Sequence, residues 1–311
     1  MKTTKIFLTG HKGFVGSAIL RELKRNGYQN VVTATRNELD LTNQLKTFNF
    51  LKQKKIKKVI IASAKVGGIK ANYSYPAEFI YENLAIQNNL IHGSFLNGIK
   101  DLIFLGSSCI YPKYAKQPIS ETSLLTSELE KTNEAYAIAK IAGVKLCEYY
   151  NKQYKTNYKC LMPCNVYGPK DNYDLESSHF LAAILKKTYI AKKRGQKKIV
   201  LWGSGSPKRE LLFVDDLANA CIFFLEKKTN HFLINIGSEI EHSIKQYANM
   251  IKKILKFKGN IIFDKIHPDG TPRKLLDCKL AKRYGWKNHI KLTEGLILTK
   301  NELIINFEKY E

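Results

Sequence analysis

The chain lacks any long apolar run, and this argues against a membrane-spanning protein. None of its hydrophobic stretches approaches the ~20 consecutive apolar residues that a helix needs to cross a bilayer. The apolar residues at 6–9 are followed at once by glycine, so they are too short for the core of a signal peptide and predict a β-strand. We therefore expect a soluble, cytoplasmic protein without a membrane partner.

The six cysteines lack the paired spacing of a metal site. Cys160 and Cys164 form one Cys-x-x-x-Cys pair with no second pair near it. The remaining cysteines are scattered along the chain: Cys109, Cys147, Cys221 and Cys278. We expect reduced, mostly buried thiols and no bound metal.

Acidic residues are scarce, with 27 Asp and Glu against 51 Lys and Arg, and the formal net charge is +24. A charge of this size can indicate a nucleic-acid partner. Here the lysines are spread over every expected helix and loop, and no aromatic-rich basic strip accompanies them. The sequence therefore predicts no nucleic-acid partner, although the positive field would attract a polyanionic cofactor and substrate.

Strand-like and helix-like segments alternate through the first half of the 311 residues. Strands are expected at 5–9, 31–35, 59–62, 102–106 and 158–162, with helices between them. This alternation predicts an α/β protein with a Rossmann-type, doubly wound parallel sheet. Beyond residue 163 the pattern changes, with a loop expected at 164–169, a further sheet strand at 232–236 and a loop at 267–274.

The second part of the chain predicts a smaller α/β domain interleaved with the first. We expect residues 1–165 and about 211–237 to form a dinucleotide-binding domain. Residues of about 166–210 and 238–311 would then form a substrate-binding domain.

Three glycines, Gly10, Gly13 and Gly16, stand between the first strand and the first helix. Glycine allows a tight turn and lets the backbone approach a pyrophosphate, which then lies at the positive end of the helix. The strand-then-helix context is what this motif requires. We expect the turn to bind a dinucleotide, with contacts from Lys12, Phe14 and Val15.

Arg36 follows the second strand, where an acid would bind the ribose of NAD and a cation suits the 2′-phosphate of NADP. Lys12 can supply a second cation, so NADPH is the expected cofactor, although Arg36 can also be an ordinary surface residue. Asp40 and Leu41 are expected to end a short strand beside the adenine. Ala64 lies in a run of small residues that permits close approach to the cofactor.

Tyr136 and Lys140 are four residues apart in an expected helix, so their side chains share one face. An adjacent ammonium lowers the pKa of a phenol, which would let Tyr136 donate a proton to a ketone oxygen. Ser107, at the end of an apolar strand, could hold that oxygen by a hydrogen bond. The same spacing at Tyr189 and Lys193 fits an ordinary helix face, so the position of Tyr136 after the glycine turn favours catalysis.

These motifs together resemble the extended short-chain dehydrogenase/reductases, which act on nucleotide sugars, and within them the GDP-L-fucose synthases. The similarity runs nearly end to end and is strongest in five segments: 64–69, 106–112, 133–140, 202–210 and 268–274. It implies NADPH-dependent epimerisation at C3 and C5 of a GDP-4-keto-6-deoxy sugar, followed by reduction at C4. It also implies a homodimer formed through helices at about 76–98 and 134–154.

The resemblance assigns a base and an acid for epimerisation to Cys109 and His179. A thiolate is a good base only if nearby positive charge lowers its pKa. Tyr136 would then protonate the C4 oxygen during hydride transfer, with Ser107 and Lys140 in support and Lys140 on the nicotinamide ribose. The alternative reading of Cys109 is a small buried residue, and that of His179 is a residue near a helix cap.

The resemblance also places Asn165, Val166 and His179 at the cofactor. It assigns five residues to the GDP-sugar: Ser108, Lys187, Trp202, Arg209 and Asp269. Trp offers a stacking face and Arg binds phosphate through two parallel hydrogen bonds. Trp202 as a buried core aromatic is the alternative.

Some positions depart from the family pattern and leave the sugar open. Lys12 and Lys187 replace Arg, Cys164 replaces Thr, and Phe213 replaces His. GDP-4-keto-6-deoxy-mannose is the first candidate substrate and a GDP-4-keto-6-deoxy-heptose for surface polysaccharide is the second. Reduction without epimerisation is the third, while a non-catalytic nucleotide-binding protein is disfavoured because Ser107, Tyr136 and Lys140 are all present.

Overall fold

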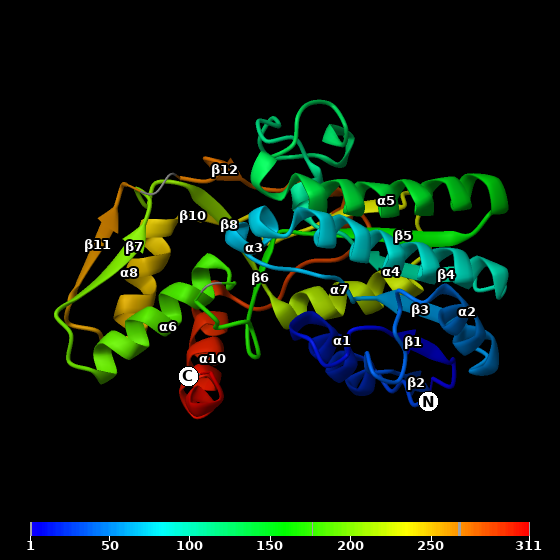
Figure 1. Cartoon of the computed structure of the whole chain (residues 1–311), viewed down its shortest axis with the longest axis horizontal. Helices are drawn as coiled ribbons and strands as arrows, with labels where there is room; N and C mark the ends of the chain where they lie inside the picture. The colour runs from blue at the N-terminus through cyan, green and yellow to red at the C-terminus, as the bar shows by residue number, and fades with distance from the viewer. Residues whose placement is uncertain (1, 176, 267–268, 311) are drawn as a thin grey trace.

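A six-stranded parallel sheet forms the centre of the computed structural model, which describes residues 2–175, 177–266 and 269–310 (Figure 1). The strand order is β2 (Val31–Val32), β1 (Ile6–Leu8), β3 (Lys58–Ile61), β4 (Asp101–Leu105), β5 (Asn157–Pro163) and β9 (Leu233–Ile236). Every pair in this sheet is parallel. The short runs of Val, Ile, Leu and Phe are buried on both faces, as in a sheet covered by helices on each side. The predicted doubly wound sheet is confirmed.

Two layers of helices cover this sheet (Figure 1). The first layer contains α2 (Gln44–Gln53), α4 (Pro76–Leu96) and α5 (Glu134–Tyr154), and the second contains α1 (Phe14–Arg25) and α7 (Val214–Glu226). Local sequence fixes several ends: Pro76 opens α4, Asp215 and Asp216 stabilise the first turn of α7, and α5 ends at Lys155 in a left-handed conformation. The chain passes from β2 across β1 to β3, so the carboxyl ends of β1 and β3 border the crevice where such sheets bind ligands.

A second cluster of buried apolar side chains lies beyond the sheet. Its elements are α6 (Phe180–Lys193), α8 (Ile244–Leu255), α10 (Leu292–Ile305) and the parallel pair β7 (Lys198–Trp202) and β11 (Asn260–Asp264). Ser243 and Gln246 cap α8 reciprocally. Residues after 274 are shared between the two cores, because Leu276 and Trp286 pack with the first.

A small sheet centred on β8 (Lys208–Phe213) connects the two clusters. It pairs with β6 (Asn165–Tyr167), β10 (Glu241–Ser243) and β12 (Arg273–Lys274). The shorter helices α3 (Ile69–Ser74) and α9 (Lys279–Arg283) and four 3₁₀ turns complete the described chain: η1 (Ser108–Ile110), η2 (Glu121–Ser123), η3 (Lys131–Asn133) and η4 (Phe307–Lys309). In the described ranges, no helix combines the length and the apolarity that a bilayer span requires.

Three local predictions were wrong. The expected loop at 164–169 contains β6, the expected loop at 267–274 contains β12, and Asp40 and Leu41 follow a turn rather than ending a strand. Residues 267–268 of the second loop lie outside the described residues. Strands of two or three residues have no detectable periodicity, and β6 and β12 exist because β8 supplies their hydrogen-bond partners from distant sequence.

Candidate active site

The glycine turn has almost no room for side chains. Gly10 has a φ of +69°, and a Cβ there would lie 2.9 Å from the carbonyl oxygen of Ala62. A Cβ on Gly16 would lie 2.0 Å from the carbonyl oxygen of Gly10. Gly13, at the N-cap of α1, has no side chain to cap the helix, which leaves the helix end open to an anion. This turn fits the pyrophosphate of a dinucleotide.

Hydrogen bonds hold the neighbouring loop against the turn. The Thr9 hydroxyl accepts from the backbone nitrogens of Ala62 at 3.1 Å and Ser63 at 3.2 Å. Asn83 of α4 accepts from the Lys65 nitrogen and donates to the Lys65 carbonyl oxygen, both at 3.0 Å. Ala64 is therefore fixed between two anchored residues, beside the crevice at the end of β3.

Two cations flank the expected position of the 2′-phosphate. Arg36 is exposed, and its guanidinium lies 3.7 Å from the Glu82 carboxylate. Hydrogen bonds from Thr35, together with the charges of Lys12 and His11, lower the pKa of Glu38. Lys12 and Arg36 thus border the same loop, and the weak exposed pair with Glu82 can exchange for a phosphate. Hydrogen bonds from Thr42, helped by Arg36, lower the pKa of Asp40 in this loop.

Tyr136, Lys140 and Ser107 meet at the carboxyl end of β4. The Lys140 ammonium donates to the Leu105 carbonyl oxygen at 2.8 Å and lies 5.7 Å from the centre of the Tyr136 ring. The Ser107 hydroxyl accepts from the Cys109 backbone nitrogen at 3.3 Å, so Ser107 begins the turn that presents Ser108 and Cys109.

The predicted low pKa of Tyr136 is wrong. Burial raises the pKa of Tyr136, with a further contribution from Cys109, and burial lowers the pKa of Lys140 to about 8. The Lys140 ammonium is bonded to the Leu105 carbonyl, and the low-polarity surroundings disfavour both charged forms. At neutral pH Tyr136 is therefore a neutral phenol, which is the form that can donate a proton.

The condition stated for a thiolate base at Cys109, a lowered pKa, is not met. The residue is only 6% exposed, and burial raises the pKa of its thiol. The positive charge of Lys274, a hydrogen bond with Ser107 and the charge of Lys140 oppose this rise. A thiolate at Cys109 therefore depends on the two lysines beside it.

His179 occupies the N-cap position of α6 but makes no side-chain capping bond. The residue is exposed, and partial burial followed by the charge of Lys274 lowers its pKa. Lys274 thus acts electrostatically on Cys109 and His179 together, which places all three around one site.

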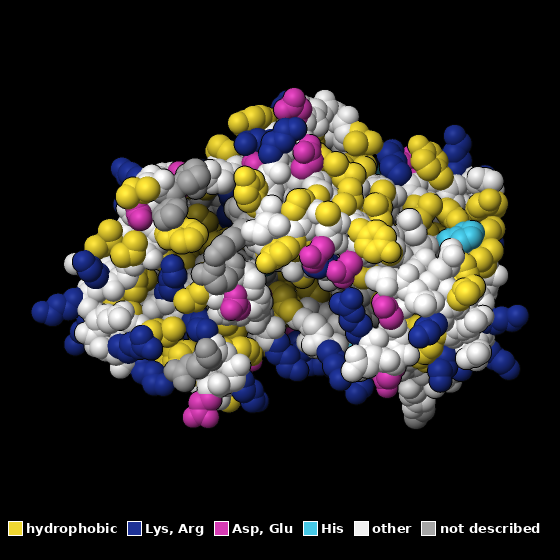
Figure 2. Space-filling model, in the orientation of Figure 1, with side chains coloured by type: hydrophobic (Ala, Val, Ile, Leu, Met, Phe, Trp, Pro, Cys, Tyr) yellow, Lys and Arg dark blue, Asp and Glu magenta, His cyan; other side chains and the backbone are white. Residues whose placement is uncertain are grey.

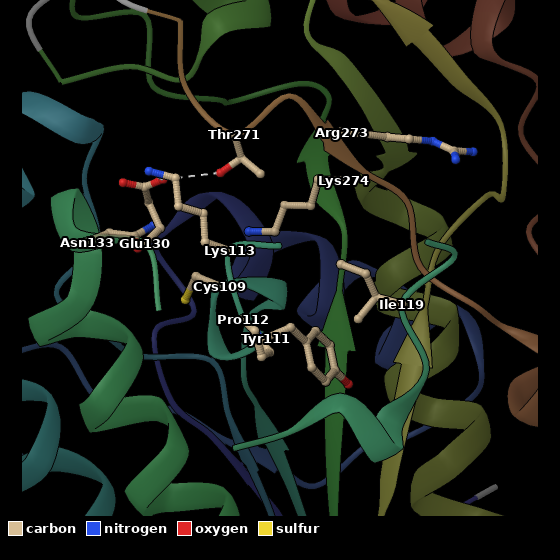
Figure 3. A pocket seen from close by; sticks show the side chains of 10 residues that line it. All are labelled: Cys109, Tyr111, Pro112, Lys113, Ile119, Glu130, Asn133, Thr271, Arg273 and Lys274. Atoms are coloured by element: carbon tan, nitrogen blue, oxygen red, sulfur yellow. Dashed lines mark hydrogen bonds and ion pairs between the residues drawn. The ribbon is translucent and has the colours of Figure 1, made fainter. Parts of the chain in front are cut away.

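A small cavity of about 30 Å³ opens beside Cys109 (Figure 3). Its lining comprises Cys109, Tyr111, Pro112, Lys113, Ile119, Glu130, Asn133, Thr271, Arg273 and Lys274. The Lys274 side chain points across the cavity toward the Cys109 side, and Glu130 accepts from the Thr271 hydroxyl at 3.4 Å. Lys113 also pairs with Glu130 at 3.1 Å, so Glu130 joins the turn after η1 to segment 269–274.

Sequence reasoning gave no role to Lys274, Glu130 or Asn133. Asn133 Oδ1 is buried without a hydrogen-bond partner among the described residues, so it can accept from a ligand hydroxyl. Lys274 and Asn133 both lie inside segments that carry the family resemblance. Their places in those segments could have identified them.

The residues expected to bind the nucleotide lie close to one another. Trp202 is 62% exposed, so it is not a core aromatic, and the Lys187 ammonium lies 5.7 Å from the centre of its ring. Asp269 accepts from the Ser204 nitrogen at 2.9 Å and the Ser204 hydroxyl at 2.6 Å. Asp269 also faces Arg209 electrostatically.

The remaining predicted residues lie near the carboxyl edge of the parallel sheet, where the cofactor is expected. Ser108 is buried in η1, while Asn165 and Val166 lie in β6 opposite Leu211 and Leu212 of β8. Three others pack partly buried against the first core: Phe14, Val15 and Leu41. These positions leave their backbone atoms near the carboxyl edge of the sheet.

Comparisons with known proteins show the family of the chain. The model of the NAD dependent epimerase/dehydratase family matches residues 6–237. GDP-L-fucose synthase 1 of Arabidopsis thaliana is 50% identical over 298 residues, covering 96% of this chain and 92% of the relative. GDP-L-fucose synthase of Escherichia coli (strain K12) is 45% identical over 319 residues, covering 100% and 99%.

A solved structure of MlghC, a GDP-mannoheptose C4 reductase from Campylobacter jejuni with NADP bound, superposes with a TM-score of 0.89. It is 37% identical and covers 98% of this chain and 99% of its own. The chain therefore belongs to the NAD dependent epimerase/dehydratase family, among the nucleotide-sugar epimerase/reductases related to GDP-L-fucose synthase.

Proposed function

We propose that the chain converts GDP-4-keto-6-deoxy-mannose to GDP-L-fucose by epimerisation at C3 and C5 and reduction at C4 with NADPH. The observation that carries this proposal is the position of Cys109, beside Lys274 and next to the Tyr136 and Lys140 pair. A simple reductase needs only Tyr136 and Lys140. A base and its stabilising cation beside the reductase residues support a site for both reactions.

NADPH would lie along the carboxyl edge of the sheet and, when bound, supplies the hydride to C4 of the sugar. The turn of Gly10, Gly13 and Gly16 would hold its pyrophosphate, and Lys12 with Arg36 would hold its 2′-phosphate. Lys140 would bind the nicotinamide ribose. The other proposed cofactor contacts are Phe14, Val15, Asp40, Leu41, Ala64, Asn165, Val166 and His179.

Epimerisation needs a base to remove a proton and an acid to return one. Burial raises the pKa of Cys109 and lowers that of His179, so both groups are neutral at pH 7. Movement of the thiol proton to His179 would create the base and the acid together. Lys274 would then stabilise the thiolate that abstracts the acidic proton beside the ketone.

Reduction uses the residues at the end of β4. The neutral Tyr136 phenol would donate its proton to the C4 oxygen, while Ser107 holds that oxygen by a hydrogen bond. Lys140, with a pKa of about 8, is mostly charged at pH 7 and would stabilise the phenolate that remains. The raised pKa of Tyr136 keeps the proton on the phenol until negative charge develops on the substrate.

The GDP moiety would extend from this site to Trp202 and the residues around it. Trp202 would stack on the guanine, while Lys187 and Arg209 would bind the diphosphate. Asp269 would support Arg209, and Ser108 would contact the sugar. Residues 166–210 and 238–311 would thus form most of the GDP-sugar domain, and 1–165 with 211–237 the NADP domain.

A GDP-4-keto-6-deoxy-heptose is the second candidate substrate, favoured by the similarity to MlghC. Kinetics with the hexose and heptose ketones, followed by NMR of each product, separate the candidates. We expect the hexose to have the higher kcat/KM and to give GDP-L-fucose. A higher value for the heptose would transfer the proposal to that sugar, and reduction of either ketone with C3 and C5 unchanged would remove the epimerase step.

We also propose a homodimer formed through α4 and α5. Five large hydrophobic side chains of these helices are exposed: Tyr81, Leu96, Ile138, Tyr149 and Tyr154. Figure 2 shows hydrophobic side chains over these helices on the face in view. Light scattering should give the mass of two chains, and Ile138→Glu should give one; a monomeric unaltered protein would contradict the proposal.

A further inference from the structure

Residues 306–310 fold back against the loop that carries His179. The Tyr310 ring lies 4.7 Å from the Tyr173 ring, and Phe307 lies 4.7 Å from Tyr189 of α6. The Lys186 ammonium, in the same helix, donates to the Tyr310 carbonyl oxygen. Figure 1 shows the C-terminal end of the chain beside α10 and near α6.

In the loop between β6 and α6, the described residues 168–175 and 177–179 include two deeply buried side chains. Asp171 is 6% exposed and Tyr173 is 1% exposed. Its next turn is held internally, because Asp174 accepts from the Ser177 nitrogen and hydroxyl, both at 2.9 Å. Asp171 and Tyr173 therefore anchor this loop in the core.

Both anchors face the 306–310 segment and the end of α10. The Tyr310 hydroxyl donates to Glu302 at 2.6 Å, and Glu302 lies within electrostatic range of Asp171 and Tyr173. The Tyr173 hydroxyl and Glu302 Oε2 are buried without hydrogen-bond partners in the described part of the chain. The contact thus contains polar groups as well as rings. Polar groups bond in fixed directions, so they define the position of the loop more narrowly than a purely apolar contact would.

The loop also reaches the cofactor side of the site. The Gly68 nitrogen donates to the Ser177 carbonyl oxygen at 2.9 Å, two residues before His179. In contrast, Ser107, Tyr136 and Lys140 stand on β4, its following turn and α5, which do not belong to this contact. A displacement of the loop would therefore move His179 more than it moves the reductase residues.

We propose that residues 306–310 form a clasp that positions the loop carrying His179 and thereby controls epimerisation separately from hydride transfer. The proposal rests on the proposed function, in which His179 returns the proton at C3 and C5. Tyr310 and Lys186 are positioning residues in this scheme, because they act through Tyr173 and the loop.

Two variants release the clasp in different ways. Tyr310→Ala removes the ring over Tyr173, and Lys186→Met removes the donor to the Tyr310 carbonyl. Lys186→Arg keeps a donor and should restore function. Lys309→Ala is the matched control, since the Lys309 ammonium bonds locally, to Asn306 at 2.8 Å.

Two assays separate the reactions in the full-length protein. Deuterium incorporation at C3 and C5 of GDP-4-keto-6-deoxy-mannose reports epimerisation, and oxidation of GDP-L-fucose by NADP⁺ reports hydride transfer without epimerisation. We expect both releasing variants to lose about tenfold or more in exchange, as small displacements of catalytic groups do. Oxidation is measured at saturating NADP⁺, which offsets a weakened contact between His179 and the cofactor, and it should fall less than about threefold. Lys309→Ala and Lys186→Arg should match the unaltered protein in both assays.

Equal losses in both assays, or normal exchange in both releasing variants, would overturn the clasp alone. No exchange in the unaltered protein, with oxidation of GDP-L-fucose intact, would overturn the proposed epimerase function and the clasp with it. The two failures are therefore distinguishable.

Discussion

The glycine turn allows the sharpest test of how closely the cofactor site is packed. A Cβ in Gly16→Ala would lie 2.0 Å from the Gly10 carbonyl oxygen, whereas ordinary contact begins at 3.4 Å. Backbone atoms must move by about 1.4 Å to relieve this overlap, since neither partner is a flexible side chain. Overpacking of this kind costs up to about 3 kcal/mol, which lowers the urea midpoint by roughly 1 M for an m-value near 3 kcal/mol/M.

Gly13→Ala is the matched control in the same turn. Its Cβ would lie 3.3 Å from the same oxygen, a contact that a small adjustment relieves. We expect a cost of less than about 1 kcal/mol for Gly13→Ala in urea unfolding of the ligand-free proteins. If the urea midpoints of the two variants agree within about 0.2 M, the close packing of Gly16 against the Gly10 carbonyl oxygen is refuted.

Tyr136→Phe should lower 4-keto reduction by about 10²-fold or more, because the phenolic proton is lost, while deuterium exchange at C3 and C5 continues. Full reductase activity, followed by NADPH absorbance, would contradict the acid role. Cys109→Ser should abolish that exchange and spare oxidation of GDP-L-fucose by NADP⁺; unchanged exchange would remove Cys109 from the mechanism. Burial raises the pKa of Asp171 from 3.8 to about 7. The folded protein therefore binds more protons between these values, and its stability should fall by up to about 4 kcal/mol as pH rises from 4 to 7. Asp171→Asn should flatten the urea midpoint across this range, and an unchanged slope would contradict the assignment.

Features that depend on neighbouring residues could be predicted from the sequence. The apolar runs that form β3, β4 and β5 are local and bounded by turns, and the glycine turn lies directly between β1 and α1. Tyr136 and Lys140 face the same site because helix geometry alone brings residues four apart together.

Features that depend on distant segments could not be predicted. β6 and β12 form only because β8 pairs with both, and Lys274 reaches Cys109 from the far end of the chain. The same limit explains the wrong direction predicted for the pKa of Tyr136, and why Cys109 does not meet the condition for a thiolate base. A neighbouring lysine is visible in the sequence, whereas the loss of water around the phenol and the thiol depends on the folded chain.

Deuterium counting tests the proposed union of epimerase and reductase most directly. The unaltered protein is incubated with GDP-4-keto-6-deoxy-mannose and NADPH in deuterated water, and the product is analysed by mass spectrometry and NMR. We predict a reduced sugar with solvent deuterium at both C3 and C5, the positions that Cys109 and His179 would exchange. A reduced product without solvent deuterium at either carbon would contradict the proposal and leave a 4-keto reductase.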